Sequence, residues 1–384
     1  MNPAAAMTLP FEAPTPAGAP RVTPAARERI VGYDLARALA ILGMVLVHFV
    51  LVMSVEQVEE EWLGRIVGFL DGRAAATFVV LAGVGLTLRA RGAGASADPE
   101  ANARIRVTLR RRGLFLLAAG FLNLLVWPGD ILRVYGVSLL LAAWFLHASG
   151  RTLWSIALAF VAGFVSLMLV LDYSKNWDWE TLTYHGLWTP TGAVRNLFFD
   201  GFRTVFPWTG LLFFGMWLGR RELREPRVAR RYLVVAAALV VVTECLSWLL
   251  VRWATRGEGA MPREDAVALF GTESMPPLPM FLLSAAATAV AVIAGSVRAG
   301  ERWGDALPVR ALVATGQLAF TWYIAHIIFG LGGVILLGLT EDQPVAAGFL
   351  TGLGFFAVAT VLSLLWRRRF RHGPLEWVMR RVAG

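Results

Sequence analysis

The chain has 384 residues, of which 57% are hydrophobic and only 16% are charged, and its mean hydropathy is +0.60. A soluble protein of this length carries more charge and less apolar surface, so these values exclude a soluble globular domain and predict an integral membrane protein. The single cysteine, Cys245, excludes an intramolecular disulfide and a thiolate cluster for structural zinc. We therefore expect helix packing alone to hold the fold.

The apolar segments follow one another from residue 30 onward. Residues 1–29 are rich in Ala and Pro and contain no apolar run long enough for a signal-peptide core, so we predict a disordered cytoplasmic tail there. A membrane-spanning helix needs about 20 residues, which makes the third and fourth segments short and the ninth long. We predict an all-α, polytopic transmembrane helix bundle of about ten spans over residues 30–384. The apolar segments are 30–53, 66–88, 113–127, 131–148, 152–172, 203–219, 232–251, 277–297, 311–337 and 345–366.

The placement of arginine predicts the orientation, because basic short loops stay in the cytoplasm. Loops between alternate segments are acidic or aromatic: "SVEQVEEEW", "DYSKNWDWETLTYHGLWTP" and "TEDQP". The remaining loops and the C-terminal stretch are rich in arginine: "RARGAGASADPEANARIRVTLRRR", "GRRELREPRVARR", "RAGERWGDALPVR" and "RRRFRHGPLEWVMRR". Both termini are therefore expected in the cytoplasm. The net charge of +9 calls for no nucleic-acid partner, since topology alone places most arginines at the inner face.

The first segment carries three ionisable side chains, Asp34, Arg37 and His48, among aliphatic ones. At about 100° per residue all three fall on one helical face, and the rise from Arg37 to His48 is about 16 Å. Ionisable groups inside a membrane are costly and usually mark a pathway or a reacting site. Asp34 and Arg37 can pair near the cytoplasmic surface. The alternative is that this pair only fixes the helix end and that His48 bonds to a neighbouring helix.

Five stretches, taken in order, carry a family resemblance: "YDLARALAILGMVLVH", "WPGDILRVYGV", "FPWTGLLFFGMWLGR", "GQLAFTWYIAH" and "RRRFRHGPLEWVMRR". Arginine, ten residues and then histidine on the first span is a hallmark of the transmembrane acyltransferase superfamily. From about residue 29 to the end, the chain resembles more closely a bacterial family of membrane proteins related to heparan-alpha-glucosaminide N-acetyltransferase. The resemblance implies transfer of an acyl group from a cytoplasmic donor to an acceptor at or beyond the membrane.

The sequence departs from the family pattern in two places. The first segment has "ARAL" where relatives commonly have Arg-Gly, and the second reads "DGRAAATFVVLAGVGL", with alanine at positions that are often aromatic. Neither departure removes an ionisable group. Both leave the shape of the acceptor pocket open.

Acyl transfer from a thioester needs a base to deprotonate the acceptor and a donor or cation to stabilise the tetrahedral oxyanion. His48 fits the catalytic base. Arg37, supported by Asp34, fits the binding of an anionic acyl donor from the inner side, because a guanidinium binds phosphate or carboxylate bidentately. Arg37 lies too far along the helix from His48 to stabilise the same oxyanion. A covalent route is disfavoured because Cys245 is the only thiol.

Further polar residues gather at the expected outer ends of the segments. Helix capping and interfacial pairing explain Asp71, Arg73 and Asp130 about as well as a functional role does. We expect Glu244 to make an internal hydrogen bond, and we expect no metal ligands. The candidates on the acceptor side are Asp71, Arg73, Asp130, Arg133, Tyr135, Tyr323 and His326. The longest outer loop carries aromatic residues that either stack on a sugar or form an interfacial belt, namely Trp177, Trp179, Tyr184 and Trp188.

These observations favour a multi-pass acyltransferase of the bacterial cytoplasmic (inner) membrane. Acetyl-CoA or another acyl-CoA is the expected donor, and a hydroxyl or amine of an envelope glycan or lipid-linked molecule is the expected acceptor. Membrane lipids are the other expected partners, and the oligomeric state is left open. The alternatives are a transporter or flippase that uses the same polar cavity without chemistry, or a non-catalytic partner in envelope assembly.

Overall fold

The computed structural model describes residues 30–54, 62–92, 98–179, 181 and 183–384. The tail predicted over residues 1–29 and residues 55–61, part of the loop predicted to be the first outer one, lie outside the described residues. Nearly all of the described secondary structure is helical, as predicted, and one short antiparallel hairpin pairs Trp177 with Tyr184. The elements are α1 (Val31–Met53), α2 (Trp62–Leu70), α3 (Arg73–Gly92), α4 (Pro99–Asn123), α5 (Leu132–Ala142), α6 (Gly150–Val170), β1 (Trp177–Asp178), β2 (Thr183–Tyr184), α7 (Pro190–Arg195), the π-helical η1 (Asn196–Asp200), α8 (Val205–Leu218), α9 (Pro226–Ala254), α10 (Arg263–Phe270), α11 (Pro279–Trp303), α12 (Leu307–Gln317), α13 (Ala319–Ala325), the π-helical η2 (His326–Leu331), α14 (Gly332–Leu336), α15 (Val345–Arg369) and α16 (Pro374–Ala383).

Each predicted apolar segment overlaps a helix, which confirms an all-α polytopic membrane protein. Among the described residues, seven helical stretches are long and apolar enough to cross a membrane. The segments predicted to be short correspond to the second half of α4 and to α5, and α8 is also shorter than a full span. The count of ten spans stays a prediction, as does the cytoplasmic location of both termini.

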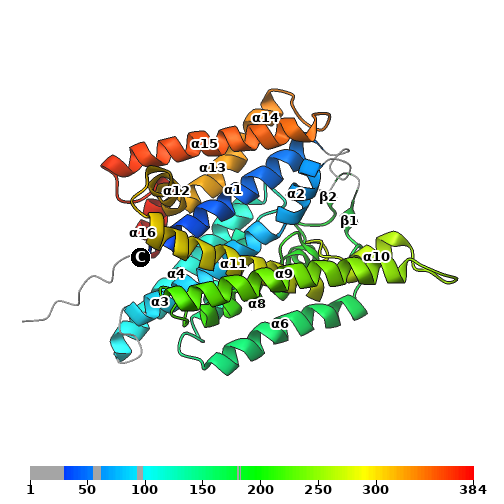
Figure 1. The fold of residues 1–384 in the computed structure, drawn as a ribbon, viewed down its shortest axis with the longest axis horizontal. Coiled ribbons are helices and arrows are strands. Elements are labelled where there is room, and N and C mark those ends of the chain that lie inside the picture. The colour runs from blue at the N-terminus through cyan, green and yellow to red at the C-terminus, as the bar shows by residue number, and fades with distance from the viewer. Residues whose placement is uncertain (1–29, 55–61, 93–97, 180, 182) are drawn as a thin grey trace, which may run out of the picture.

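Helix α1 lies in the middle of the bundle (Figure 1) and packs against α3, α11, α12 and α15. A second group of contacts joins α3 to α8 and α8 to α6. Glycines allow the closest of these approaches, as small residues do in membrane bundles. A Cβ at Gly316 would lie 1.8 Å from the carbonyl oxygen of Asp34, and one at Gly215 would lie 2.2 Å from that of Val80. The central helix is therefore held on several sides, which fixes the positions of its ionisable side chains.

The outer helices α6 and α9 present apolar side chains to the surroundings rather than to the core. In a membrane protein such surfaces face lipid, where exposed leucine and valine cost nothing. The two helices thus bound the bundle, whereas the polar residues of α1 lie inside it. The exposed apolar residues of these two helices include Leu158, Leu169, Val170, Val234, Val235, Val241, Val242, Trp248 and Leu249.

The two ends of the bundle differ in structure (Figure 1). The amphipathic helix α16 lies at one end, close to the start of α1, whereas α2, α10 and the β1–β2 hairpin lie at the other. At the first end Glu376 of α16 accepts hydrogen bonds from the backbone N–H groups of Phe320 and Thr321, at 2.8 and 3.2 Å. These N–H groups belong to the first turn of α13, so Glu376 supports the start of the helix that carries Tyr323.

Candidate functional site

The predicted pair at the start of α1 forms. Arg37 donates a hydrogen bond to the carboxylate of Asp34, which is 1% exposed, and Gln317 of α12 donates to the other carboxylate oxygen at 3.3 Å. The side chain of Arg37 keeps 30% of its surface exposed. A guanidinium in this position is oriented by Asp34 and remains partly exposed.

The structure brings together two histidines that the sequence places 278 residues apart. Nδ1 of His48 lies 2.9 Å from Nε2 of His326, and the two rings stack with centroids 5.1 Å apart. His326 is fully buried, and its Nδ1 lies 3.1 Å from the backbone carbonyl oxygen of Trp322. The π-helical segment η2 begins at His326, and local π-helix of this kind occurs often at functional sites. His48 therefore has a partner, which lies on a distant helix.

A small cleft opens beside His48. It is lined by residues of α1, of the α2–α3 and α4–α5 turns, of α3 and α13, and by Arg203 just before α8. The open space measures about 20 Å³, which holds a single water molecule and excludes an acyl chain. The lining residues are Met44, Val47, His48, Leu70, Asp71, Gly72, Ala74, Ala75, Gly129, Ile131, Arg203 and Tyr323.

Asp71 and Arg203 form an ion pair in this cleft. Nη2 of Arg203 lies 3.3 Å from Oδ1 of Asp71, and the hydroxyl of Ser274 donates to Oδ2 of Asp71 at 2.5 Å. The guanidinium of Arg203 also lies over the ring of Trp208, 4.9 Å from its centroid. The Asp71 side chain is 40% exposed and that of Arg203 is 11% exposed. The pair therefore lines the same cleft as His48, and its carboxylate side is the more exposed one.

Arg203 is a site residue that the sequence interpretation missed. A signal was present, because Asp200 and Arg203 repeat the Asp-x-x-Arg spacing of Asp34 with Arg37 and of Asp130 with Arg133. The spacing does not by itself predict the partner, since Asp200 pairs with Arg195. Arg203 turns instead toward Asp71, which is distant in the sequence.

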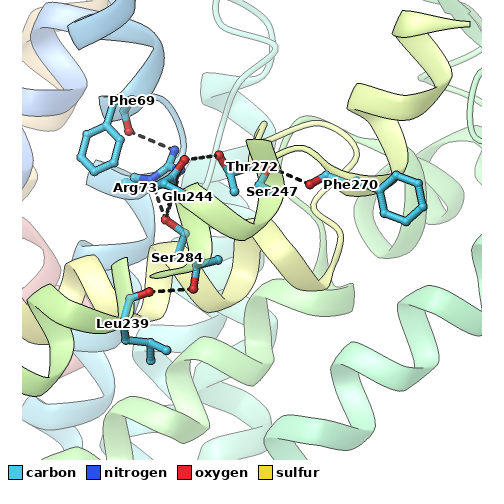
Figure 2. A network of polar contacts seen from close by, with 9 residues as sticks. Phe69, Arg73, Leu239, Glu244, Ser247, Phe270, Thr272 and Ser284 are labelled. Carbon is cyan, nitrogen blue, oxygen red and sulfur yellow. Dashed lines mark hydrogen bonds and ion pairs between the residues drawn. The ribbon is translucent and has the colours of Figure 1, made fainter. Parts of the chain in front are cut away.

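Arg73 lies apart from the cleft, and the pairing of Asp71 with Arg73 that capping considerations allowed does not occur. Nη2 of Arg73 donates to Oε1 of Glu244 at 2.6 Å and to the hydroxyl of Ser284 at 3.2 Å, and its Nη1 donates to the carbonyl oxygen of Phe69 at 3.0 Å. Figure 2 shows this network, which joins α3 to α9 and α11. The internal hydrogen bond expected of Glu244 is confirmed. The turn at Gly72, whose φ is +68°, lies between Asp71 and Arg73, and the two side chains point in different directions.

Asp130 anchors a second buried network at the start of α5. Its Oδ1 accepts a hydrogen bond from the backbone N–H of Arg133 at 3.1 Å, as a capping residue does, and Asn123 donates to Oδ2 at 2.8 Å. The Arg133 guanidinium lies 3.6 Å from the carboxylate and donates to Asn196 at 3.0 Å. The Tyr323 hydroxyl, 3.4 Å from Asp130, connects this network to the cleft.

Arg133 and Tyr135 do not line the cleft, although both are acceptor-side candidates. Arg133 is 1% exposed and is directed toward Asp130 and Asn196. Tyr135 packs edge-on against Phe78, and its hydroxyl has no hydrogen-bond partner among the described residues. Of the seven acceptor-side candidates, only Asp71 and Tyr323 line the cleft, and His326 reaches it through His48.

The aromatic residues of the loop between α6 and α7, which the arginine pattern predicts to be outer, divide into buried and exposed ones. The indole N–H of Trp177 donates to the carbonyl oxygen of Asp200 at 2.6 Å, and the hydroxyl of Tyr184 donates to Oδ1 of Asp200 at 2.7 Å. Burial, with the nearby carboxylate, raises the pKa of Tyr184 to about 12, so this hydroxyl remains a donor. Trp177 and Tyr184 thus build the loop. Trp179 and Trp188 are 42% and 60% exposed. For these two residues both alternatives, an interfacial belt and stacking on a sugar, stay predictions.

These features describe a class: a polytopic helical membrane protein in which one histidine of a pair shares a narrow cleft with an ion pair. The catalytic-domain model of heparan-alpha-glucosaminide N-acetyltransferase matches residues 29–249, which is more than half of the chain. The chain therefore belongs to this family, and the predicted relationship is confirmed. A second model, described as a protein of unknown function (DUF418), matches residues 216–384. A comparison with curated proteins gave no match.

The two matched regions divide the site between them. His48, Asp71 and Arg203 lie in the first region, and His326 lies in the second. Among the described residues, no group of three or more His, Cys, Asp and Glu side chains is arranged as for a metal ion. The histidine pair is thus built from both regions.

Proposed function

We propose that the protein is a membrane acyltransferase that moves an acyl group, in the first instance acetyl from acetyl-CoA, to a hydroxyl or amine of an envelope glycan or lipid-linked acceptor. The observation that carries the proposal is the placement of His48 in a cleft shared with the Asp71–Arg203 pair. Membership of an acetyltransferase family supports the same reaction class. In this proposal the protein resides in the bacterial cytoplasmic membrane.

His48 acts as the base in this reaction. As the acceptor oxygen or nitrogen attacks the thioester carbonyl carbon, its proton passes to Nε2 of His48. Collapse of the tetrahedral intermediate breaks the bond between carbon and sulfur, and the same proton goes to the leaving thiolate. The products are the acylated acceptor and free CoA thiol, and His48 returns to its neutral form.

Arg203 supplies positive charge where the oxyanion develops. It lines the same cleft as His48, which Arg37 does not. A guanidinium has five N–H groups, and within the described residues Arg203 directs hydrogen bonds only to Asp71 and the Phe202 carbonyl. The remaining N–H groups fit stabilisation of a developing negative charge in a site with room for a single water molecule.

The two substrates reach the site from opposite ends in this scheme. Arg37 lies about 16 Å along α1 from His48, and with the support of Asp34 it accommodates the anionic part of the donor. The acceptor enters past Asp71 and Arg203. The space beside His48 is small, so entry requires the ion pair to part, and the closed pair keeps water from the thioester.

The second candidate is a transporter or flippase for a small molecule or lipid-linked precursor. The observation that favours it is that polar groups lie at two depths along α1: Asp34 with Arg37 near its start, and the histidine pair with Asp71 toward its other end. Transport needs no thioester cleavage. The two functions therefore differ in whether CoA thiol is released.

The deciding experiment uses the purified chain in lipid nanodiscs with a Cys245→Ala background, so that only CoA supplies a thiol. Acetyl-CoA is added with a glycan and lipid extract from cells that lack the protein, and free thiol is followed over time. We expect thiol release that depends on the extract and disappears in His48→Ala. Absence of both CoA binding and thiol release in folded protein would move the assignment to the transporter.

A further inference from the structure

The histidine pair continues into a third group, and the three form one directed chain of hydrogen bonds. Nδ1 of His326 lies 3.1 Å from the Trp322 carbonyl oxygen, and Nε2 of His326 lies 2.9 Å from Nδ1 of His48. A carbonyl oxygen only accepts, so Nδ1 of His326 carries the hydrogen. In a neutral imidazole the other nitrogen then holds the lone pair.

The direction of the second hydrogen bond follows from the first. Because Nε2 of His326 is the acceptor, Nδ1 of His48 must be the donor. The lone pair of neutral His48 is therefore on Nε2, the ring atom that is not engaged by His326. A histidine side chain in water favours the opposite tautomer, with the hydrogen on Nε2, so this arrangement needs an acceptor beside Nδ1.

We propose that His326 is a positioning residue that holds His48 in the tautomer whose Nε2 lone pair serves as the base. This proposal rests on the proposed acyltransfer by His48 and assigns the residue that prepares it. As Nε2 of His48 gains the acceptor's proton, the Nδ1–H can move toward Nε2 of His326, and it returns when the leaving thiolate is protonated. No proton is gained or lost in a full cycle.

A neutral partner suits this depth in the membrane. In many hydrolases a carboxylate orients the catalytic histidine, but an unpaired carboxylate inside a bilayer is costly. Among the described residues, neither His48 nor His326 hydrogen-bonds to a carboxylate. The nearest charged groups in the site are already paired: Arg203 with Asp71, and Asp130 with Arg133.

The helix that carries His326 is fixed from two sides. The indole N–H of Trp322 donates to the hydroxyl of Ser363 in α15 at 2.7 Å. This hydrogen bond holds Trp322, whose backbone carbonyl oxygen accepts from His326. Glu376 supports the first turn of α13. The ring of His326 is thereby held by packing and neutral hydrogen bonds, as a supporting residue requires.

The test compares His326→Leu, which removes the acceptor, with His326→Gln, whose Oε1 can still accept from Nδ1 of His48. We expect kcat to fall in the leucine variant by at least about tenfold and by no more than the roughly 10⁴-fold lost when a catalytic histidine is left in the wrong tautomer. The glutamine variant should keep most of the activity. KM for acetyl-CoA should stay unchanged in both, because neither change touches the donor end.

A double variant separates positioning from an independent role. In a His48→Ala background, His326→Leu should cause no further loss of turnover, because residues that act as a unit are not additive. A full additional loss, or equal losses in the leucine and glutamine variants, would overturn the proposal. Thermal unfolding of each variant shows whether the protein is folded.

The tautomer itself can be read without any activity. In protein labelled with ¹⁵N-histidine, whose five histidines are assigned by single substitutions, we expect His48 to show a protonated Nδ1 and an unprotonated Nε2. His326→Leu should shift these signals toward the opposite tautomer. If His48 shows Nε2–H in the unmodified chain, the inference fails even if acyl transfer is found. If the tautomer is as expected and no transfer occurs, only the proposed function fails.

Discussion

Asp71 and Arg73 lie two residues apart, yet they belong to polar clusters of different character. Arg73 is 2% exposed, and its three guanidinium nitrogens all donate to Ser284, Glu244 or Phe69 (Figure 2). Asp71 instead borders an open cleft in which Nε2 of His48 has no protein partner within the described residues. A network in which every guanidinium nitrogen has a partner fastens helices together, whereas unused polar atoms beside open space are available to a ligand.

The comparison predicts that substitutions in the two clusters affect different properties of the protein. Changes in the cleft should reduce turnover in folded protein. Changes in the network should reduce the amount or stability of folded protein, with turnover per folded molecule preserved.

The largest effect is expected for His48→Ala. Loss of the base should lower turnover by about two to four orders of magnitude, the usual contribution of general base catalysis. Free thiol release in nanodiscs measures the rate, and size-exclusion chromatography measures the folded yield. If turnover is unchanged while the folded yield falls, His48 is a packing residue and another group must act as the base.

Arg73→Ala should produce the opposite pattern. Removing one partner of a buried ion pair costs about 3–5 kcal/mol, and we expect the low end because the Glu244 side chain is 33% exposed. Thermal unfolding in detergent measures the loss. Replacing both residues, as Arg73→Met with Glu244→Leu, should recover much of the stability. A folded Arg73→Ala protein with a hundredfold lower turnover would place Arg73 in the catalytic site.

Sequence alone reached the parts of the fold that depend on local pattern. Apolar length predicts the helices, and the three-residue spacing of Asp34 and Arg37 predicts their pair, because both properties belong to one helix. The pairing of His48 with His326 depends on how α1 packs against α13 and η2, which no local pattern records. Arg203 was missed for the same reason, since its partner Asp71 lies on a distant turn.

Arg203→Ala tests the electrostatic part of the cleft. Removing one group that stabilises an oxyanion costs about a hundred- to a thousandfold in kcat, and the ion pair with Asp71 is lost as well. Arg203→Lys keeps the charge without the planar geometry, so its loss should be smaller. An unchanged kcat in the alanine variant would show that another group meets the oxyanion.

Arg37→Ala should act on donor affinity rather than on the chemical step. A charge-assisted hydrogen bond lost from the anionic donor corresponds to about a ten- to hundredfold rise in KM for acetyl-CoA, with kcat little changed. Asp34→Asn serves as the contrast, because it weakens the buried pair with Arg37 and should lower folded yield. Equal effects of Arg37→Ala on kcat and KM would argue against a binding role.

The smallest effect is expected at Glu376, which lies in neither cluster but supports the helix of Tyr323 and His326. Its carboxylate accepts hydrogen bonds from two N–H groups of the first turn of α13, at 2.8 and 3.2 Å, and from the hydroxyl of Thr321 at 2.5 Å. Loss of such a cap costs about 1 kcal/mol, so Glu376→Ala should lower the unfolding temperature slightly and reduce turnover a few-fold. Glu376→Gln retains an acceptor oxygen, so its unfolding temperature and turnover should lie between those of the unmodified protein and those of Glu376→Ala. If Glu376→Ala lowers the unfolding temperature but leaves turnover untouched, the position of α13 is set by Trp322 and Ser363 alone.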